Sequence, residues 1–146
     1  MGILSRLKVV IVLAFAVSGL FVATGGAARA AEGAEWRFYH NSGDNSMLYY
    51  DMESVTAPSR GTADVWTKLE VRGKVYSLAL YEISCVDRRL RTLIKYGYDN
   101  ASKSIIPLPN SDETYPTRWM YIVPETSEAK LVKFICPLAK EKETAN

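Results

Sequence analysis

Two cysteines, Cys85 and Cys136, follow an N-terminal segment that has the form of a secretory signal. Exported thiols meet an oxidising compartment, where two cysteines without a third partner most simply form one disulfide. This bond would close a loop of about 52 residues, for which the chain-entropy model gives about 4 kcal/mol. That value is comparable to the net stability of a small domain. The predicted disulfide therefore constrains the fold more than any other feature of the chain.

The first 30 residues have the three parts of a signal peptide. Arg6 and Lys8 give a basic start, and a largely apolar run follows over residues 9–22. Ala28-Arg29-Ala30 matches the A-x-A pattern of a signal-peptidase site, so we expect cleavage after Ala30, with cleavage after Ala31 as the neighbouring alternative. An uncleaved membrane anchor is the alternative, but the run is shorter than the roughly 20 residues that span a bilayer.

Cleavage changes the charge of the chain. It removes three basic residues and no acidic one, so the 18 basic and 16 acidic residues become 15 and 16, a net charge of −1. A near-neutral chain has no overall attraction to nucleic acid or anionic lipid. We expect no nucleic-acid partner, no stable membrane insertion after cleavage, and a periplasmic or secreted protein, with association with the cell surface as a further alternative.

The 116 residues that remain of 146 are enough for one domain. We assign residues 1–30 to the signal peptide, 31–140 to a single domain and 141–146 to a flexible tail, because the end of the chain has no large apolar residue.

Most of the domain alternates apolar and polar residues with a period of two, which is typical of half-buried strands. The pattern predicts an antiparallel sheet of about five or six strands in meander order, with Gly73 in a tight turn that requires a positive φ. The expected strands are 36–40, 47–51, 62–71, 74–85, 88–98 and a weaker one at 104–108.

Near the C-terminus the period changes to that of a helix. Apolar residues recur at spacings of three and four, namely Leu131, Phe134, Ile135 and Leu138. The helix should begin near Thr126 and end near Cys136, since Pro137 would clash with the carbonyl of Lys133. About ten residues are too few for a stable isolated helix, so its apolar stripe should pack on the sheet. The fold class is therefore α+β.

Few residues offer catalytic or metal-binding chemistry. His40 is the only histidine, and both cysteines are expected to be oxidised, so nucleophilic catalysis and a zinc or copper site are disfavoured. The acidic pair Asp112-Glu113, and Asp51 with Glu53, lie in no calcium-loop pattern. We predict a protein that is not an enzyme and that needs no cofactor and no metal.

Three residues are candidates for protein binding. Trp66 alternates with charged residues on its strand, so it should stand on the solvent face as a binding hot spot, unless the helix or a loop covers that face. Arg89 and Arg91 share one face of their strand. They either contact a partner or pair with carboxylates such as Glu70 or Glu82 across the hairpins.

Several short motifs occur in an order similar to that of the surface-adhesin protein E family. They are Trp36, Tyr50-Asp51 with Ser54-Val55, Val65-Trp66, Tyr81-Glu82-Ile83-Ser84-Cys85, Arg88-Arg89-Leu90-Arg91, Trp119, Pro124 and Phe134-Ile135-Cys136. The resemblance spans residues 35–136 and implies an antiparallel sheet with a C-terminal helix tied to it by the disulfide. It also implies adhesion through binding of host extracellular proteins.

Two functions follow as hypotheses. The first is an exported, non-enzymatic, adhesin-like module that binds extracellular or envelope proteins, with a homodimer as a further association. The second is a periplasmic protein that binds a small ligand, or acts as an inhibitor, through a concavity between sheet and helix. A deep apolar pocket beneath the helix would favour the second.

Overall fold

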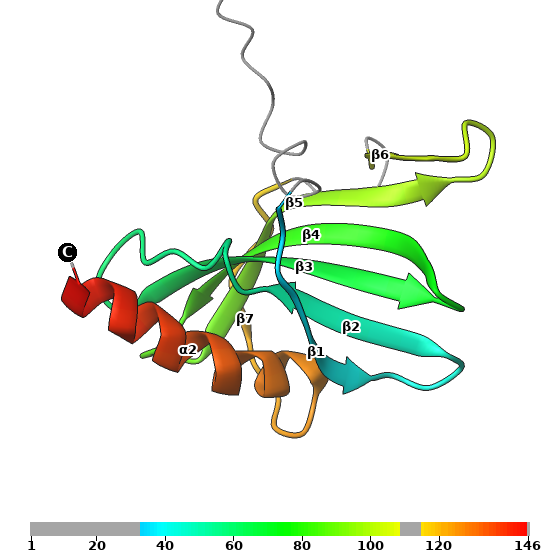
Figure 1. The fold of residues 1–146 in the computed structure, drawn as a ribbon. Coiled ribbons are helices and arrows are strands. Elements are labelled where there is room, and N and C mark those ends of the chain that lie inside the picture. The colour runs from blue at the N-terminus through cyan, green and yellow to red at the C-terminus, as the bar shows by residue number, and fades with distance from the viewer. Residues whose placement is uncertain (1–32, 109–114, 146) are drawn as a thin grey trace, which may run out of the picture.

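The computed structural model describes residues 33–108 and 115–145. It contains an antiparallel sheet with one C-terminal helix on one face, as predicted (Figure 1). The elements are β1 (Trp36–Asn41), β2 (Ser46–Asp51), β3 (Thr62–Val71), β4 (Lys74–Ser84), β5 (Arg89–Asp99), β6 (Ser104–Pro107), β7 (Met120–Tyr121) and α2 (Ser127–Ala145). The predicted signal peptide, residues 1–30, and the acidic pair Asp112-Glu113 lie outside the described residues.

Six strands follow one another in meander order, β1 to β6, and β7 adds to β5 beside them. The turn between β3 and β4 contains Arg72 and Gly73, with φ angles of 51° and 75°. Two consecutive positive φ angles characterise a type I′ turn, whose twist matches that of a hairpin. The tight turn expected at Gly73 is therefore confirmed. The two-residue strand β7 was not predicted, because so short a segment carries no periodicity.

The alternation along β3 separates the two faces of the sheet. Ala63 and Val65 are fully buried, and they belong to the same core as Leu131 and Ile135 of α2. Successive side chains of a strand point to opposite faces, so Trp66 points away from the helix. The sheet thus has one face covered by α2 and one face that α2 leaves uncovered.

The helix is longer than the sequence predicts. It runs from Ser127 to Ala145 and contains Pro137, so the expected end near Cys136 is wrong, and the segment predicted as a tail is helical through Ala145. Contacts beyond the proline account for this difference. Ala139 is buried, the Lys142 amine donates to the Val55 carbonyl at 2.6 Å, and the Gly61 amide donates to the Glu143 carboxylate at 2.7 Å. These contacts offset the cost of a proline in a helix interior, which is about 3 kcal/mol.

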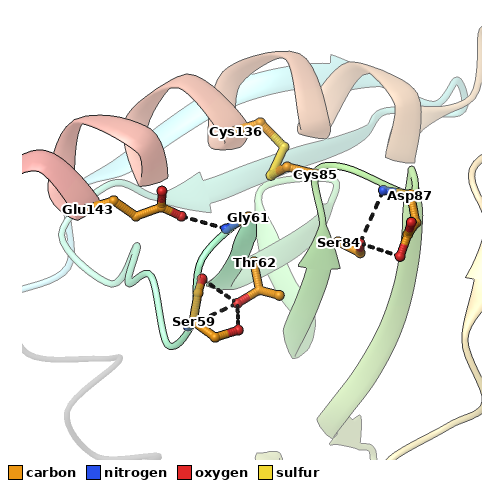
Figure 2. Close-up of a disulfide and its surroundings, with 8 residues drawn as sticks. All are labelled: Ser59, Gly61, Thr62, Ser84, Cys85, Asp87, Cys136 and Glu143. Carbon is orange, nitrogen blue, oxygen red and sulfur yellow. Dashed lines mark hydrogen bonds between the residues drawn. A yellow bond between two sulfur atoms is a disulfide. The ribbon is translucent and has the colours of Figure 1, made fainter.

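The predicted disulfide is present. Cys85 directly follows β4 and Cys136 lies in the middle of α2, with their Cα atoms 5.7 Å apart (Figure 2). The bond and the contact of Glu143 with Gly61 attach the helix to the same end of the sheet. Within residues 33–108 and 115–145, no helix is long and apolar enough to cross a membrane.

The proline in α2 generates the first prediction. Pro137 is exposed, so Pro137→Ala should restore a backbone hydrogen bond without opening a cavity. Part of the gain is offset because alanine makes the unfolded chain more flexible. We expect the free energy of unfolding to rise by about 2 kcal/mol in urea titrations. Pro124→Ala, outside the helix, is the control and should change it by less than about 1 kcal/mol. A destabilised Pro137→Ala protein would contradict the balance of contacts given above.

The disulfide generates the second prediction. Replacing both cysteines, Cys85→Ala with Cys136→Ala, should lower the free energy of unfolding by about 2–4 kcal/mol, because the unfolded chain loses its cross-link. Urea titrations of the two proteins measure this loss. Thiol titration of denatured, unreduced wild-type protein should find no free thiol. Two free thiols per chain would contradict the bond itself.

Candidate functional site

The uncovered face of the sheet is the candidate site. We call it the open face and define it by Asp64, Trp66, Lys68 and Glu70 of β3, with the residues in register beside them on neighbouring strands. Antiparallel pairing sets side chains of the same face directly opposite one another. The register therefore brings Tyr49 of β2 next to Lys68, and Glu82 of β4 next to Asp64.

Trp66 lies in the middle of this face. Its ring is 6.1 Å from that of Tyr96 on β5, and its backbone amide donates to the Ser54 hydroxyl at 3.0 Å. The side chain is half-buried among its neighbours on the sheet, so it is less exposed than alternation alone predicts. The competing expectation is that the helix or a loop covers Trp66. The helix does not cover it, because α2 packs on the opposite face.

Lys68 is held between aromatic rings. Its amine lies 4.8 Å from the ring centre of Trp36 and 4.7 Å from that of Tyr49, and 2.7 Å from the Glu70 carboxylate. Only 13% of the Lys68 side chain is exposed. An ammonium group over an aromatic face is attracted by the negative electrostatic potential that the ring quadrupole creates there. This half of the open face is consequently fixed before any partner arrives.

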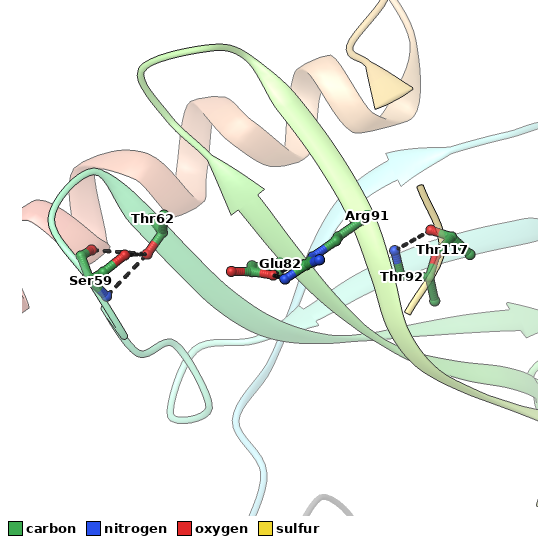
Figure 3. Close-up of polar contacts among 6 residues, drawn as sticks. All are labelled: Ser59, Thr62, Glu82, Arg91, Thr92 and Thr117. Atoms are coloured by element: carbon green, nitrogen blue, oxygen red, sulfur yellow. Dashed lines mark hydrogen bonds and ion pairs between the residues drawn. The ribbon is translucent and has the colours of Figure 1, made fainter. Parts of the chain in front are cut away.

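Arg91 and Arg89 form a second cluster of cations and rings. Arg91 pairs with Glu82 at 2.5 Å, and Figure 3 shows the two side chains extending toward each other from β5 and β4. The Arg91 guanidinium lies 4.7 Å from the ring centre of Trp119, and that of Arg89 lies 5.9 Å from the same ring. The expected pairing of one arginine with Glu82 is confirmed.

Arg89 has a different partner from the carboxylates that the sequence suggested. It pairs with Asp87 at 2.7 Å, in the turn after β4, and also lies 5.8 Å from the Tyr121 ring centre. This pairing lowers the pKa of Asp87, mainly through the hydrogen bond from Arg89. Both arginines are thus engaged within the chain, each by a carboxylate and by one or two aromatic rings.

Sequence reasoning did not place Trp119 in this cluster. The tryptophan comes from a segment that docks on β5 through two hydrogen bonds, both at 2.9 Å. The Thr117 amide donates to the Thr92 carbonyl, and the Thr92 amide donates to the Thr117 hydroxyl (Figure 3). No local sequence pattern predicts this docking, because it joins residues that are 25 positions apart in the chain. The only sequence signal was the residue type, since tryptophan is common at interfaces.

Asp64 is a polar group on the open face whose hydrogen bonding is incomplete, as is that of the Arg89 Nε atom. The Oδ1 atom of Asp64 is buried without a hydrogen-bond partner. Burial raises the pKa of Asp64, the nearby Glu82 carboxylate raises it further, and Arg91 partly lowers it. The ionised form of Asp64 is therefore disfavoured in the folded protein.

The helix side of the sheet has a small cavity under the first turn of α2. Its volume is about 180 Å³, and its walls include Tyr81, Leu90, Ile122 and Glu128. Burial raises the pKa of the neighbouring Tyr39, with contributions from Tyr81 and Glu128. The volume is below the roughly 300–1,000 Å³ of typical small-molecule pockets.

A larger hollow of about 610 Å³ lies beside the disulfide. Its walls include Arg60, Val86, Pro137 and Lys140, all of which are exposed, so it is a surface groove rather than an enclosed pocket. Neither cavity is the deep apolar pocket expected of a small-ligand binder.

No three or more His, Cys, Asp or Glu side chains converge as metal ligands in the described part of the chain. His40, the single histidine, contacts the Lys130 amine of α2 through its Nδ1 atom at 3.0 Å. The open face instead offers aromatic rings and ion-paired charged groups, which are suited to non-covalent contacts with another surface.

Comparison with protein-family models, with curated proteins and with solved structures finds no match for this chain.

The pKa shifts on the open face generate the third prediction. The folded-state pKa of Asp64 is raised, so its protonated form stabilises the fold fully below the unfolded pKa, and this stabilisation is lost as pH rises through the folded pKa. Asp64→Asn should therefore raise the melting temperature at pH 7 relative to wild type, and the difference should shrink toward pH 3. Thermal melts across this range measure it.

Asp87→Asn is the matched control because its shift has the opposite sign. The folded-state pKa of Asp87 is lowered, so its stabilisation is present above the unfolded pKa and is lost as pH falls through the folded pKa. The variant should melt below wild type at pH 7 and approach it in acid. If Asp64→Asn also melted below wild type at pH 7, burial would not be the dominant effect on Asp64.

Proposed function

We propose that the protein is an exported, non-enzymatic binding module that binds a protein partner on its open face. One observation carries the proposal. The face that α2 leaves uncovered gathers the Trp66–Tyr96 pair between two clusters in which cations lie over aromatic rings. Tryptophan, tyrosine and arginine are the residues that most often dominate protein–protein binding energy.

The rigidity of this face supports a binding role. Lys68 and Arg91 each have a carboxylate partner and an aromatic ring, and 13% and 30% of their side chains are exposed. Side chains that are already ordered lose little conformational entropy on association, which improves affinity for a given contact area. Much of the ordering cost of binding has therefore been met during folding.

The charge of the open face indicates the kind of partner. Lys68, Arg89 and Arg91 are balanced by Glu70, Asp87 and Glu82, and Asp64 adds a further carboxyl group. A face without excess positive charge has no general attraction to nucleic acid or anionic lipid. A protein surface with apolar and hydrogen-bonding groups fits this chemistry better.

The resemblance to the surface-adhesin protein E family supports a partner outside the cell or in the envelope. A disulfide between the two cysteines suits an oxidising compartment, as does the signal peptide expected from the sequence. Within this proposal the partner class is an extracellular or envelope protein, and the host extracellular proteins are the first candidates to test.

Trp66 provides the fourth prediction. If it anchors a partner, Trp66→Ala should weaken binding by about 2 kcal/mol, or roughly 30-fold. Because Trp66 is half-buried, the same change should cost only about 1 kcal/mol of folding stability. Surface plasmon resonance against a panel of purified extracellular-matrix and serum glycoproteins, with thermal melts of each variant, measures both quantities.

Phe134→Ala is the matched control. Phe134 is an exposed aromatic residue of α2, on the other side of the sheet, where it stacks on Tyr50 at 5.9 Å. Its truncation should leave binding within about twofold of wild type if the open face is the binding surface. The proposal fails if no protein of the panel binds, or if Trp66→Ala leaves binding unchanged.

A further inference from the structure

The outer edge of β1 is the least protected margin of the sheet. In the described residues β1 pairs only with β2, whereas the outer side of β5 carries β6 and β7. The opposite margin, β6, is four residues long and ends in Pro107, which has no amide hydrogen to donate. β1 contains neither proline nor lysine, the residues that commonly block an edge, and Phe38 within it is 55% exposed.

The backbone groups that β1 offers along this edge follow from its contacts with β2. The Glu35 amide donates to the Asp51 carboxylate, and the Glu35 carbonyl accepts from the Met52 amide. Both backbone groups of residue 35 therefore point toward β2. Since the direction alternates along a strand, the backbone groups of Trp36 and Phe38 in β1 point outward, before the irregularity between Phe38 and His40. Extending the same alternation to Ala34, which precedes β1, directs its backbone groups outward as well.

We propose that two copies of the chain pair antiparallel through the outer edges of β1, with Trp36 opposite Trp36 of the second copy. In this register the outward backbone groups meet in reciprocal hydrogen-bonded pairs, Trp36 with its counterpart and Ala34 with Phe38 of the other chain. The contact is isologous, so it closes as a two-fold dimer and leaves no further edge of the same kind.

Charge complementarity selects this register. Arg37 and Glu35 are exposed and paired with each other within one chain. With the axis at Trp36, Arg37 faces Glu35 of the second copy, and the reverse pair forms at the symmetric position. With the axis one residue later, Arg37 faces Arg37 of the second copy, which is repulsive. With the axis at Phe38, Arg37 faces Tyr39, so no charge pair forms.

The position of the helix is compatible with the same register. Lys130, in the first turns of α2, contacts His40 near the end of β1. An axis at Trp36 leaves each His40 four residues from the axis, whereas an axis at Phe38 leaves it two residues away and brings both helix starts closer to the axis. The open faces of the two copies would then join at Trp36, which lies against Lys68.

This pairing involves only residues 34–38 of each chain, whereas a standard interface has roughly 20–30 residues on each side. We therefore expect a weak dimer, with a dissociation constant in the micromolar range or above. The proposal does not depend on the binding role of the open face. A monomer that binds a partner through Trp66, or a dimer that binds none, would separate the two.

Charge exchange tests the proposal, and it is the fifth prediction. Sedimentation equilibrium of the mature, oxidised wild-type protein should show a reversible monomer–dimer equilibrium. Arg37→Glu sets two carboxylates opposite each other at both symmetric positions, and Glu35→Arg sets two guanidinium groups there. Each variant alone should weaken dimerisation at least about tenfold. Thermal melts should show that both variants remain folded, because neither side chain is in the core.

Two experiments that restore opposite charges across the dimer contact test whether the proposed strand register, and not a general effect of charge, explains the loss of dimerisation. An equimolar mixture of the Arg37→Glu and Glu35→Arg proteins should form a heterodimer, since each carboxylate then faces a guanidinium group. The double variant Glu35→Arg with Arg37→Glu should dimerise about as well as wild type. A wild-type protein that stays monomeric at millimolar concentration overturns the proposal. Single variants that dimerise normally, or a mixture that does not recover, overturn it as well.

Discussion

The attachment of α2 to one end of the sheet is the constraint on which the rest of the structure depends. A helix that contains Pro137 is intrinsically poor, and three kinds of contact hold it in place. The disulfide fixes its middle, Leu131 and Ile135 fill the core before the proline, and Lys142 and Glu143 bind the segment between β2 and β3 after it. Because a single helix can cover only one face of a sheet this wide, its attachment decides which face is left open.

On the open face, the exposed aromatic residues are accompanied by ion-paired cations. Large apolar side chains on a bare sheet would promote aggregation. Here the rings lie beside cations, and each cation has a carboxylate partner, as in the cluster of Lys68, Glu70 and Trp36. The face is therefore ordered and close to electrical balance, while its rings stay accessible from one side. Asp64 departs from this arrangement because its Oδ1 atom has no partner and its pKa is raised.

The two edges of the sheet differ in how many of their backbone groups are paired within the described residues. On the β5 side, β6, β7 and the segment around Thr117 pair with the backbone groups of β5, and β6 ends at Pro107. On the β1 side, Trp36 and Phe38 leave their backbone groups free within the described chain. A meander has two ends by construction, and within the described residues the edge strand at the β1 end is longer than β6 at the other end. The association surfaces inferred above, the open face and the β1 edge, meet at Trp36.

What the sequence determined is what depends on near neighbours in the chain. A period of two located the strands from Trp36 to Pro107, assigned the two faces of β3, and put Arg89 and Arg91 on one face. The Arg72-Gly73 turn and the two cysteines were sufficient for the meander and the disulfide. Each of these features follows from local geometry or from elimination among very few residues.

Tertiary structure decided the features that depend on distant residues. Pro137 locally predicts the end of a helix, and only contacts with Val55 and Gly61 extend it to Ala145. Trp119 reaches the arginines because its segment docks on β5, and the pKa of Asp64 depends on burial and on Glu82 from the next strand. Local propensities amount to a few kcal/mol at most, so packing and hydrogen bonds between distant segments can override them.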